Sequence, residues 1–344
     1  FRVLINTIKF RLIRRTSFYS RKILTMNAVI GIDIGGTTTT FGLVNEKGDI
    51  LKEATIPTKA EEHVTKYLPR LFKELRDLLS SYPDIQLKGI GIGAPNANYY
   101  KGTIEKPANL KWGDETPLKD LIEQEFKVKT ALTNDAKAAA IGEMKFGVAR
   151  GMKNFIMITL GTGLGSGIVV NGELVYGHTS FAGELGHLIV KDDGRMSPFD
   201  RRGSLEAYVS VTGLRRTVSK MLADLTYPSE LRSVPYEKLT GEMISEAALK
   251  GDKIALEAFE YTGFFLGRAL ANAVLFTSPE AIVLFGGLAH AKDLIFQPTL
   301  RYMEKYMLPV FRGTVRLMLS GLQDKNAAVL GSAALIWHEL EKKN

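Results

Sequence analysis

The fold of this chain is decided by a glycine-rich stretch, Ile30-Gly31-Ile32-Asp33-Ile34-Gly35-Gly36-Thr37-Thr38-Thr39-Thr40-Phe41-Gly42-Leu43-Val44-Asn45, because the pattern occurs twice. It returns without a gap as Ile156-Met157-Ile158-Thr159-Leu160-Gly161-Thr162-Gly163-Leu164-Gly165-Ser166-Gly167-Ile168-Val169-Val170-Asn171. Each copy predicts an apolar strand, a tight Gly/Thr turn and a second apolar strand. The duplication predicts two related half-molecules. Two such turns, rich in backbone N–H groups and hydroxyls, can hold the phosphates of one nucleotide from opposite sides.

The composition is that of a globular protein with two domains. A chain of 344 residues is long enough for two domains that each bury a core. No run of about eighteen apolar residues occurs, so we expect no membrane span. The sequence has no cysteine. This excludes disulfides and thiolate metal sites and favours a reducing, cytoplasmic compartment.

The first 25 residues differ from the rest in charge. They carry seven basic residues and no acidic one, so the formal net charge of +8 leaves the remainder close to neutral. The basic balance is therefore not interpreted as affinity for nucleic acid. Met26 directly precedes the first repeat, which favours Met26 as the native start and residues 1–25 as a basic leader outside the folded protein. The alternative is a transit peptide, because the segment is rich in Arg and lacks acidic residues.

Strands alternate with helices along the rest of the chain, which predicts an α/β architecture. Apolar runs predict strands over residues 28–44 (as a hairpin), 50–56, 87–93, 128–132, 155–171, 281–285 and 315–319. Helical spacing predicts helices over 61–80, 118–126, 136–146, from 205 onward, and over 241–250, 253–276 and 327–341. We expect Pro69 to bend the first helix or shift its start. We expect a smaller lobe of residues 26–133 plus about 325–344, to which the last helix returns, and a larger lobe of residues 134–324.

The two turns are the predicted nucleotide site. Asp33 ends the first strand and can hold Mg²⁺ directly or through water, because Mg²⁺ prefers oxygen ligands. The predicted phosphate contacts are Gly35, Gly36, Thr37 and Thr38 in the first turn and Gly161, Thr162 and Gly163 in the second. The alternative is a plain hairpin turn, which fits either stretch alone better than it fits the repetition.

Neither turn matches the other common glycine-rich nucleotide motifs. No Gly-Lys-Ser/Thr ending follows either turn, which excludes a Walker loop, and no helix follows the glycines as in a dinucleotide fingerprint. Gly286 and Gly287 after an apolar strand offer a third close backbone approach, suited to adenine and ribose. The alternative is again a plain turn, because a Gly-Gly pair commonly ends a strand.

These motifs resemble those of a known family. Asp33-Ile34-Gly35-Gly36-Thr37, Thr162-Gly163-Leu164-Gly165-Ser166-Gly167 and Gly286-Gly287 are similar to the phosphate and adenosine motifs of the sugar kinase, heat-shock chaperone and actin superfamily. Within it, Gly183-Glu184-Leu185-Gly186-His187 resembles the signature of the ROK family (repressors, open reading frames and sugar kinases). The resemblance runs in the family's order from Asn27 to the last predicted helix. It implies a two-lobed, actin-like ATPase (ribonuclease H-like) fold with the active site in the interdomain cleft.

The resemblance also implies roles at a sugar site. Phosphoryl transfer to a hydroxyl needs a group that accepts its proton. Asp135, at a predicted strand-to-helix junction, is expected to be this general base, and Asn134 to bind a sugar hydroxyl; the alternative is that they cap the helix. The resemblance implies further sugar contacts from Asn109, Glu184, His187 and Glu206. Their alternatives are a salt-bridged loop pair for Glu184 and His187 and an ordinary first-turn residue for Glu206.

One segment departs from the family pattern. ROK proteins usually carry three cysteines here that bind a structural zinc together with the histidine, whereas this chain has Ser197, Phe199 and Ser204 at those places. Neither Ser nor Phe forms the thiolate bonds that tetrahedral zinc requires. We therefore expect no zinc, a loop held by packing around Phe199 and by hydrogen bonds from the serines, and a His187 that serves the sugar.

The sequence thus predicts a cytoplasmic, ATP-dependent hexose kinase of the ROK type that uses Mg-ATP. Glucose, phosphorylated at O6, is the first expectation; kinases of N-acetylglucosamine, N-acetylmannosamine, mannose or fructose are the alternatives. A ROK transcriptional repressor is less expected, since we expect no helix-turn-helix domain before Asn27. A catalytically silent sugar sensor is disfavoured by both phosphate turns and Asp135. The resemblance implies a homodimer, and we expect neither nucleic acid nor membrane as a partner.

Overall fold

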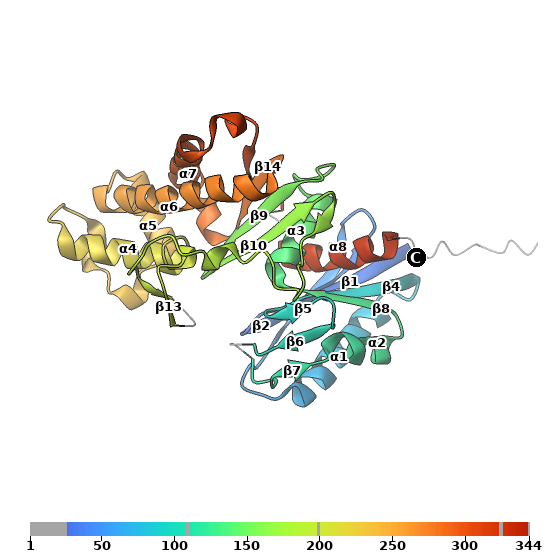
Figure 1. Ribbon diagram of the computed structural model, residues 1–344. Helices are drawn as coiled ribbons and strands as arrows, with labels where there is room; N and C mark the ends of the chain where they lie inside the picture. Colours follow the sequence, from blue (N-terminus) through green and yellow to red (C-terminus); the bar gives the residue numbers. More distant parts are fainter. Residues whose placement is uncertain (1–25, 108–109, 198–199, 323–325, 343–344) are drawn as a thin grey trace, which may run out of the picture.

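Two five-stranded sheets, one in each lobe, form the centre of the protein (Figure 1). The computed structural model describes residues 26–107, 110–197, 200–322 and 326–342. The strand order is β3-β2-β1-β4-β8 in the first sheet and β11-β10-β9-β14-β15 in the second. In both sheets three antiparallel strands are followed by two parallel ones. The two sheets are therefore equivalent strand by strand, as a duplication predicts, and the predicted α/β architecture is confirmed.

The strands follow the apolar runs closely. The first sheet consists of β1 (Met26–Ile34), β2 (Thr38–Asn45), β3 (Ile50–Pro57), β4 (Ile85–Gly93) and β8 (Lys129–Thr133). The second consists of β9 (Phe155–Leu160), β10 (Leu164–Val170), β11 (Glu173–Leu174), β14 (Ala281–Phe285) and β15 (Arg316–Leu319). Two small antiparallel sheets were not predicted, one of β5 (Ala97–Asn98), β6 (Thr103–Glu105) and β7 (Glu115–Thr116), the other of β12 (Met196–Ser197) and β13 (Arg201–Arg202).

The helices carry the remaining regular structure. They are α1 (Val64–Ser80), α2 (Leu118–Phe126), α3 (Asp135–Phe146), α4 (Val211–Asp224), α5 (Gly241–Leu249), α6 (Lys253–Thr277), α7 (Asp293–Tyr306) and α8 (Ala327–Glu341). Short 3₁₀ turns are η1 (Leu185–His187), η3 (Leu205–Ala207), η4 (Glu230–Ser233), η5 (Tyr236–Lys238), η6 (Gly287–Ala291) and η7 (Pro309–Phe311). Among the described residues, no helix combines the length and the hydropathy needed to cross a bilayer.

Three helix predictions need correction. Residues 205–207 form only the turn η3, and α4 begins at Val211, where the Ser210 hydroxyl caps it by accepting the Gly213 N–H at 2.9 Å. Pro69 lies inside α1, so of its two expected effects a shifted start is excluded and a bend stays a prediction. Helix α7 was missed, since Pro298 interrupts its pattern; in the structure this proline packs against the bare backbone of Gly263 on α6.

The two repeated hairpins differ by one residue at the turn. In the first, Ile34 pairs with Thr39, so four residues lie between the last two paired residues. In the second, Leu160 pairs with Leu164, so three residues connect β9 and β10. The two copies therefore match in sequence without a gap but differ by one residue in strand register. Thr37 in the first turn and Thr162 in the second are both exposed to solvent.

The first sheet buries both faces. Alternate residues of β1 point to opposite sides of the sheet, as the pleat requires. Ile30 and Ile32 belong to a core cluster with Leu71 and other residues of α1, whereas Val29 belongs to a second cluster with Leu330 of α8. Figure 1 shows α1 and α2 on one side of this sheet and α8 on the other. The sheet is thus the middle layer of three.

The second sheet is covered in the same way. Ile156 and Ile158 of β9 face a large cluster built with α4, α5, α6 and α7. Met157, between them, faces the opposite cluster, which contains Ala139 and Ala140 of α3. The middle strand β9 therefore carries apolar residues on both of its faces, as expected for a strand buried on both sides.

Helices α3 and α8 each follow a strand of one main sheet in the chain but pack on the other main sheet. Helix α3 follows β8 of the first sheet but packs against β9 and β10, and α8 follows β15 of the second sheet but packs against β1 and β4. Glycines allow these close approaches. A Cβ added at Gly91 of β4 would lie 1.8 Å from the Ser332 carbonyl oxygen of α8, and one at Gly331 would lie 2.6 Å from the Ala138 carbonyl oxygen of α3. The crossed helices therefore join the two halves backbone to backbone.

Replacing Gly331 by Ala is expected to destabilise the protein by about 1–3 kcal/mol, the usual cost of overpacking. The new Cβ would meet the Ala138 carbonyl at 2.6 Å. Gly241→Ala is the control, because a Cβ there would meet nothing nearer than 3.3 Å, at the first residue of α5. Urea unfolding measures both variants. Equal loss in both, or none in either, would show that α3 and α8 are not held at contact distance.

Candidate active site

Two carboxylates meet where the parallel strands of the first sheet end. Asp33 lies at the end of β1 and is paired with Gly93 at the end of β4, which is itself paired with Thr133 at the end of β8. Asp135 follows as the first residue of α3, and a Cβ added at Gly93 would lie 3.6 Å from its Cα. Ligand sites in open α/β sheets lie at this edge. Both predicted acids are therefore brought to one place.

Both carboxylates have raised pKa values. Burial raises the pKa of Asp33 to about 7, and the nearby charge of Asp135 adds to the effect. Burial likewise raises the pKa of Asp135, against the opposing effect of the Ala136 N–H, which donates to its Oδ1 at 2.7 Å. The Asp135 side chain still contacts solvent, so protein atoms surround it without enclosing it. Two partly desolvated acids close to one another suit proton transfer or cation binding.

Asn134 is the N-cap of α3. Its backbone is extended, and its side-chain oxygen accepts the Ala136 N–H at 2.9 Å. The capping alternative therefore holds for Asn134, whose amide oxygen is used in the cap. Asp135 is already inside the first turn, so capping does not account for that residue.

The first turn closes on itself and leaves its hydroxyls outside. The Gly35 N–H donates to the Thr38 carbonyl at 2.9 Å, and the side chains of Thr37 and Thr38 are exposed. Thr39 is different, because it is buried and its hydroxyl shares hydrogen bonds with Thr58 and Tyr67 at 2.9 and 3.0 Å. Thr39 therefore fixes the base of the turn, while the two threonines before it face solvent.

The second turn is tied to one of the predicted sugar residues. The Gly161 N–H donates to the Gly163 carbonyl at 3.0 Å, and the Glu206 carboxylate accepts the Leu164 N–H at 2.9 Å. A Cβ added at Gly163 would lie 2.4 Å from the Glu206 carboxylate, so a larger residue there would displace this carboxylate. Thr162, Gly163 and Glu206 also line a cavity of about 230 Å³. The predicted phosphate and sugar residues are neighbours at this point.

Gly286 and Gly287 lie beside the second turn. Gly286 has φ +100°, and a Cβ there would lie 2.7 Å from the Leu160 carbonyl, one residue before the turn. Gly287 lines a cavity of about 490 Å³, together with Val211, Gly241, Glu242, Ser245, Leu288, His290 and Ala291. The Val211 N–H donates to the Gly161 carbonyl at 2.9 Å, which connects this cavity to the turn. The cavity has room for an adenosine group next to the predicted phosphate contacts.

Glu184 and His187 stand beside the start of β10. Gly186 between them has no room for a side chain, because a Cβ would lie 2.4 Å from the Leu164 carbonyl. The Ser166 hydroxyl holds the same segment by donating to the Gly183 carbonyl and accepting the Leu185 N–H at 3.0 Å. Of the pair, only His187 lies in a helical turn, the short η1, and Glu184 directly precedes that turn.

The charges at these positions act on one another. Burial raises the pKa of Glu184, the charges of Lys137 and His187 lower it, and those of Asp135 and Glu206 raise it. The structure therefore gathers four of the six predicted catalytic and sugar-binding residues into one charged cluster: Asp135, Glu184, His187 and Glu206. Asn134 adjoins the cluster in sequence, and Asn109 lies outside the described residues.

The loop that lacks cysteines is held by an arginine. Arg195 donates to the Ala207 carbonyl at 3.2 Å, the Gly213 carbonyl at 3.0 Å and the Thr217 hydroxyl at 2.9 Å, and its guanidinium lies 4.7 Å from the Tyr208 ring centroid. This role was not predicted. Its signal in the sequence was an arginine inside a loop, which alone does not distinguish a buried side chain from an exposed one.

The predicted serine bonds are found only in part. The Ser197 hydroxyl donates to the Arg201 carbonyl at 2.7 Å, as expected. The buried Ser204 hydroxyl has no hydrogen-bond partner within the described residues, so that part of the prediction is wrong. Phe199 lies outside the described residues. Within residues 26–107, 110–197, 200–322 and 326–342, no group of three His, Asp or Glu side chains is arranged to hold a metal ion.

Comparison with known proteins places these features in one family. A ROK family profile matches residues 29–339. A glucokinase of Halalkalibacterium halodurans is 33% identical over 327 residues, which cover 92% of this chain and 97% of that protein. A ROK family glucokinase from Streptomyces griseus, solved in complex with glucose and AMPPNP, is similar with a TM-score of 0.73 and 29% identity, over 90% of this chain and 98% of that chain. A ROK family transcriptional regulator, homologous to the Escherichia coli MLC protein, has a TM-score of 0.83 and 25% identity, over 91% of this chain and 78% of that chain. The chain belongs to the ROK family and has the two-domain, actin-like ATPase fold.

Proposed function

We propose that this protein is an ATP-dependent hexose kinase that phosphorylates glucose at O6. The observation that carries the proposal is the meeting of Asp135 with Glu184, His187 and Glu206 beside the second glycine turn. Glucokinases among the relatives, one of them solved with glucose and an ATP analogue, support the same activity. A base, a set of polar sugar contacts and a phosphate cradle are the parts that this reaction needs.

Asp135 is the proposed general base. It accepts the proton of the attacking sugar hydroxyl while the oxygen approaches the γ-phosphate in line. Its raised pKa makes the carboxylate a stronger base than an aspartate of ordinary pKa. The position at the start of α3, a helix packed into both halves, fixes the carboxylate relative to the sheet. Positioning of this kind is a large part of catalysis in phosphoryl transfer.

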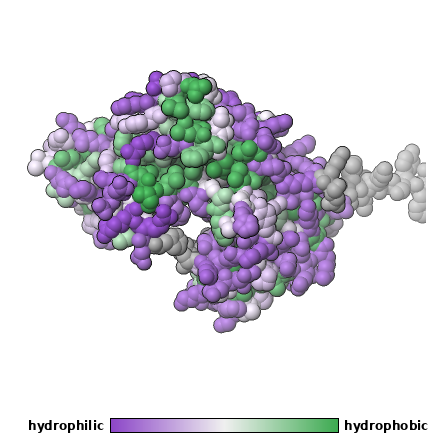
Figure 2. All heavy atoms as spheres, viewed as in Figure 1, coloured by the Kyte–Doolittle hydropathy of each residue, from purple (hydrophilic) through white to green (hydrophobic). Residues whose placement is uncertain are grey.

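The sugar is proposed to bind through hydrogen bonds. Glu184, His187, Glu206, the amide group of Asn134 and Asn109 supply donors and acceptors for the ring of hydroxyls on a hexose. A polar site of this kind rejects analogues that lack a hydroxyl, because its own groups would then stay unpaired. Closure of the two lobes, between which Figure 2 shows a hollow, would exclude water from the transferred phosphate.

The residues around Asp33 fit a magnesium ion brought by the nucleotide. Mg²⁺ is held mainly by substrate phosphates, waters and one or two carboxylates, so a single aspartate beside the phosphate turn is a sufficient protein ligand. Two neighbouring carboxylates with raised pKa values also indicate a place where a cation would relieve repulsion. When bound, the ion neutralises charge on the phosphate oxygens. Gly36, Thr37, Thr38, Thr162 and Gly163 are proposed to donate to those oxygens. The N–H groups of Gly35 and Gly161 close their own turns, so these two glycines are proposed to let the backbone approach the phosphates.

Three other assignments stay predictions. The protein is proposed to be a cytoplasmic homodimer, and no zinc is proposed in the loop of Arg195. An N-acetylhexosamine kinase or a fructokinase remains the alternative activity, since the contacts around sugar carbon 2 are not fixed by the named residues. A sugar-binding regulator is a second candidate, because a ROK family transcriptional regulator is structurally similar over most of this chain.

A panel of hexoses with Mg-ATP is the first test. We expect ADP release with glucose, with a kcat/KM higher than for mannose, fructose, N-acetylglucosamine or N-acetylmannosamine. Preference for another member of the panel would replace glucose as the substrate. Sugar binding in calorimetry without ADP release from any member would favour the regulator.

Asp135→Asn is expected to lower kcat by about 10²–10⁴-fold, the usual contribution of a general base. Glucose affinity should change little, because the amide keeps the size of the carboxylate. Coupled ADP-release assays and calorimetry measure the two quantities. Asp120→Asn, at another first helical turn, is the control. Lost affinity with normal turnover would overturn the assignment.

The stability of the ligand-free protein is expected to depend on Asp33. The folded-state pKa of about 7 lies above the ordinary value of 3.8, so the stability that this group contributes is fully present below pH 3.8 and is lost as the pH rises through 7. Asp33→Asn should therefore raise the melting temperature more at pH 8 than at pH 5. Calorimetry in EDTA checks this. The same difference at both pH values would contradict the raised pKa.

A further inference from the structure

Lys137 is a buried cation that the proposed reaction does not use. It lies on α3 two residues after Asp135, and only 1% of its surface is exposed. Its ammonium donates to the Ser180 carbonyl at 3.2 Å and lies 5.9 Å from the centroid of the Tyr176 ring. Burial lowers the pKa of Lys137, whereas the charges of Glu184 and Asp135 raise it. A buried ammonium is unfavourable unless it is paired. The groups that pair with Lys137 therefore indicate what this residue does.

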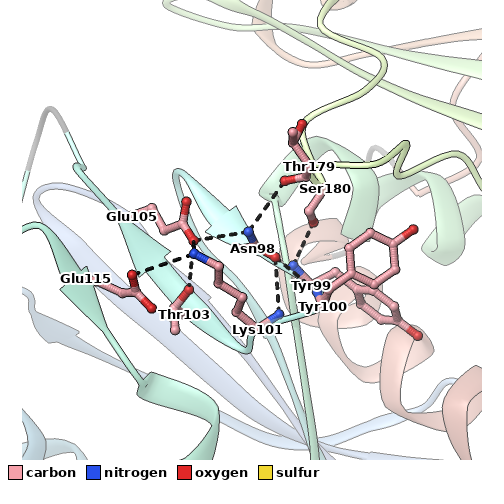
Figure 3. Close-up of polar contacts among 9 residues, drawn as sticks. All are labelled: Asn98, Tyr99, Tyr100, Lys101, Thr103, Glu105, Glu115, Thr179 and Ser180. Atoms are coloured by element: carbon pink, nitrogen blue, oxygen red, sulfur yellow. Dashed lines mark hydrogen bonds and ion pairs between the residues drawn. The ribbon is translucent and has the colours of Figure 1, made fainter.

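The partner of Lys137, Ser180, is fixed from the smaller lobe as well. Ser180 is buried and has φ +74°, and its hydroxyl accepts the Tyr99 N–H at 2.7 Å. The neighbouring Thr179 carbonyl accepts the Asn98 side-chain amide at 3.4 Å. Figure 3 shows these two bonds side by side, between the strand β5 and the incoming loop. Residues 179–180 are therefore held by β5 on one side and by α3 on the other.

The same loop leads directly to a proposed sugar contact. Glu184 is four residues after Ser180, and close contacts restrain the chain around them. The Ala182 N–H donates to the Tyr176 carbonyl at 3.0 Å, and a Cβ added at Gly177 would lie 2.8 Å from the Cβ of Ala182. The loop of residues 176–184 is thus a compact turn. A shift at Ser180 must therefore reach Glu184.

We propose that Lys137 is a positioning residue for the sugar: by binding the Ser180 carbonyl it holds the loop of residues 176–184 and so places Glu184 opposite Asp135. This inference rests on the proposed hexose kinase function. The charge of Lys137 also lowers the pKa of both carboxylates, against the burial that raises it, and so offsets their mutual repulsion. One side chain thereby fixes the distance between the proposed base and a proposed sugar contact.

Lys137→Met tests this, because methionine keeps the length of the apolar stem and removes the ammonium. We expect the KM for the hexose to rise about tenfold or more, the effect of losing a hydrogen bond from a charged group, while the KM for ATP changes little. Lys145→Met is the matched control. Lys145 lies on the same helix, about two turns further along, and binds Glu341 of α8 at 2.5 Å. Equal hexose KM values in the two variants would overturn the proposal.

Amide hydrogen exchange gives a readout that needs no sugar. In Lys137→Met, the amides of residues 176–185 should exchange about tenfold faster or more than in the wild type and in Lys145→Met. Lys137→Gln, which keeps an N–H donor, should give intermediate exchange and an intermediate KM, and it serves if the methionine variant does not fold. Unchanged exchange in the loop would show that Lys137 does not hold it. Faster exchange throughout the protein would show that Lys137 stabilises the fold as a whole. A wild type that phosphorylates no hexose would refute the proposed function, and the exchange data would then still decide whether Lys137 holds the loop.

Discussion

The contact between α3 and α8 is the constraint on which both halves depend. The two helices cross where Gly331 meets the backbone of Ala138, and each helix then covers the sheet of the opposite half. Such a contact allows no side chain at the crossing, so its geometry is set by backbone atoms alone. Because Asp135 begins α3, the helix that joins the halves is also the one that aims the proposed base.

The candidate site results from this arrangement. The ends of β1, β4 and β8 bring Asp33 next to Asp135, and the start of β10 gathers the other half of the cluster. Leu164 is central there, since its N–H is accepted by Glu206 and its carbonyl faces Gly186. The segments around Gly186 and Glu206 are therefore both held against the backbone of Leu164. The position of the candidate site therefore depends in part on main-chain geometry at Leu164.

Much of the fold could be predicted from the sequence, because strong local signals specify it. Apolar runs between glycines gave the ten strands of the two main sheets within a few residues, apart from the short β11, and the ROK motifs predicted the family. What depends on tertiary contacts could not be predicted. The one-residue difference between the turns is set by strand pairing, Arg195 acts through carbonyl groups on α4 and η3, and Lys137 is buried by a loop some forty residues away. The roles of the site residues stay predictions.

The crossing of the helices has a consequence for how the chain reaches its native state. The face of β1 that carries Val29 packs against α8, which follows it in the chain by some 300 residues. During synthesis this apolar surface therefore lacks its partner helix until residues 327–341 have emerged from the ribosome. Contacts of such long sequence separation slow folding and expose nascent chains to aggregation. A stop of translation before α8 would leave the first sheet without one of its outer layers.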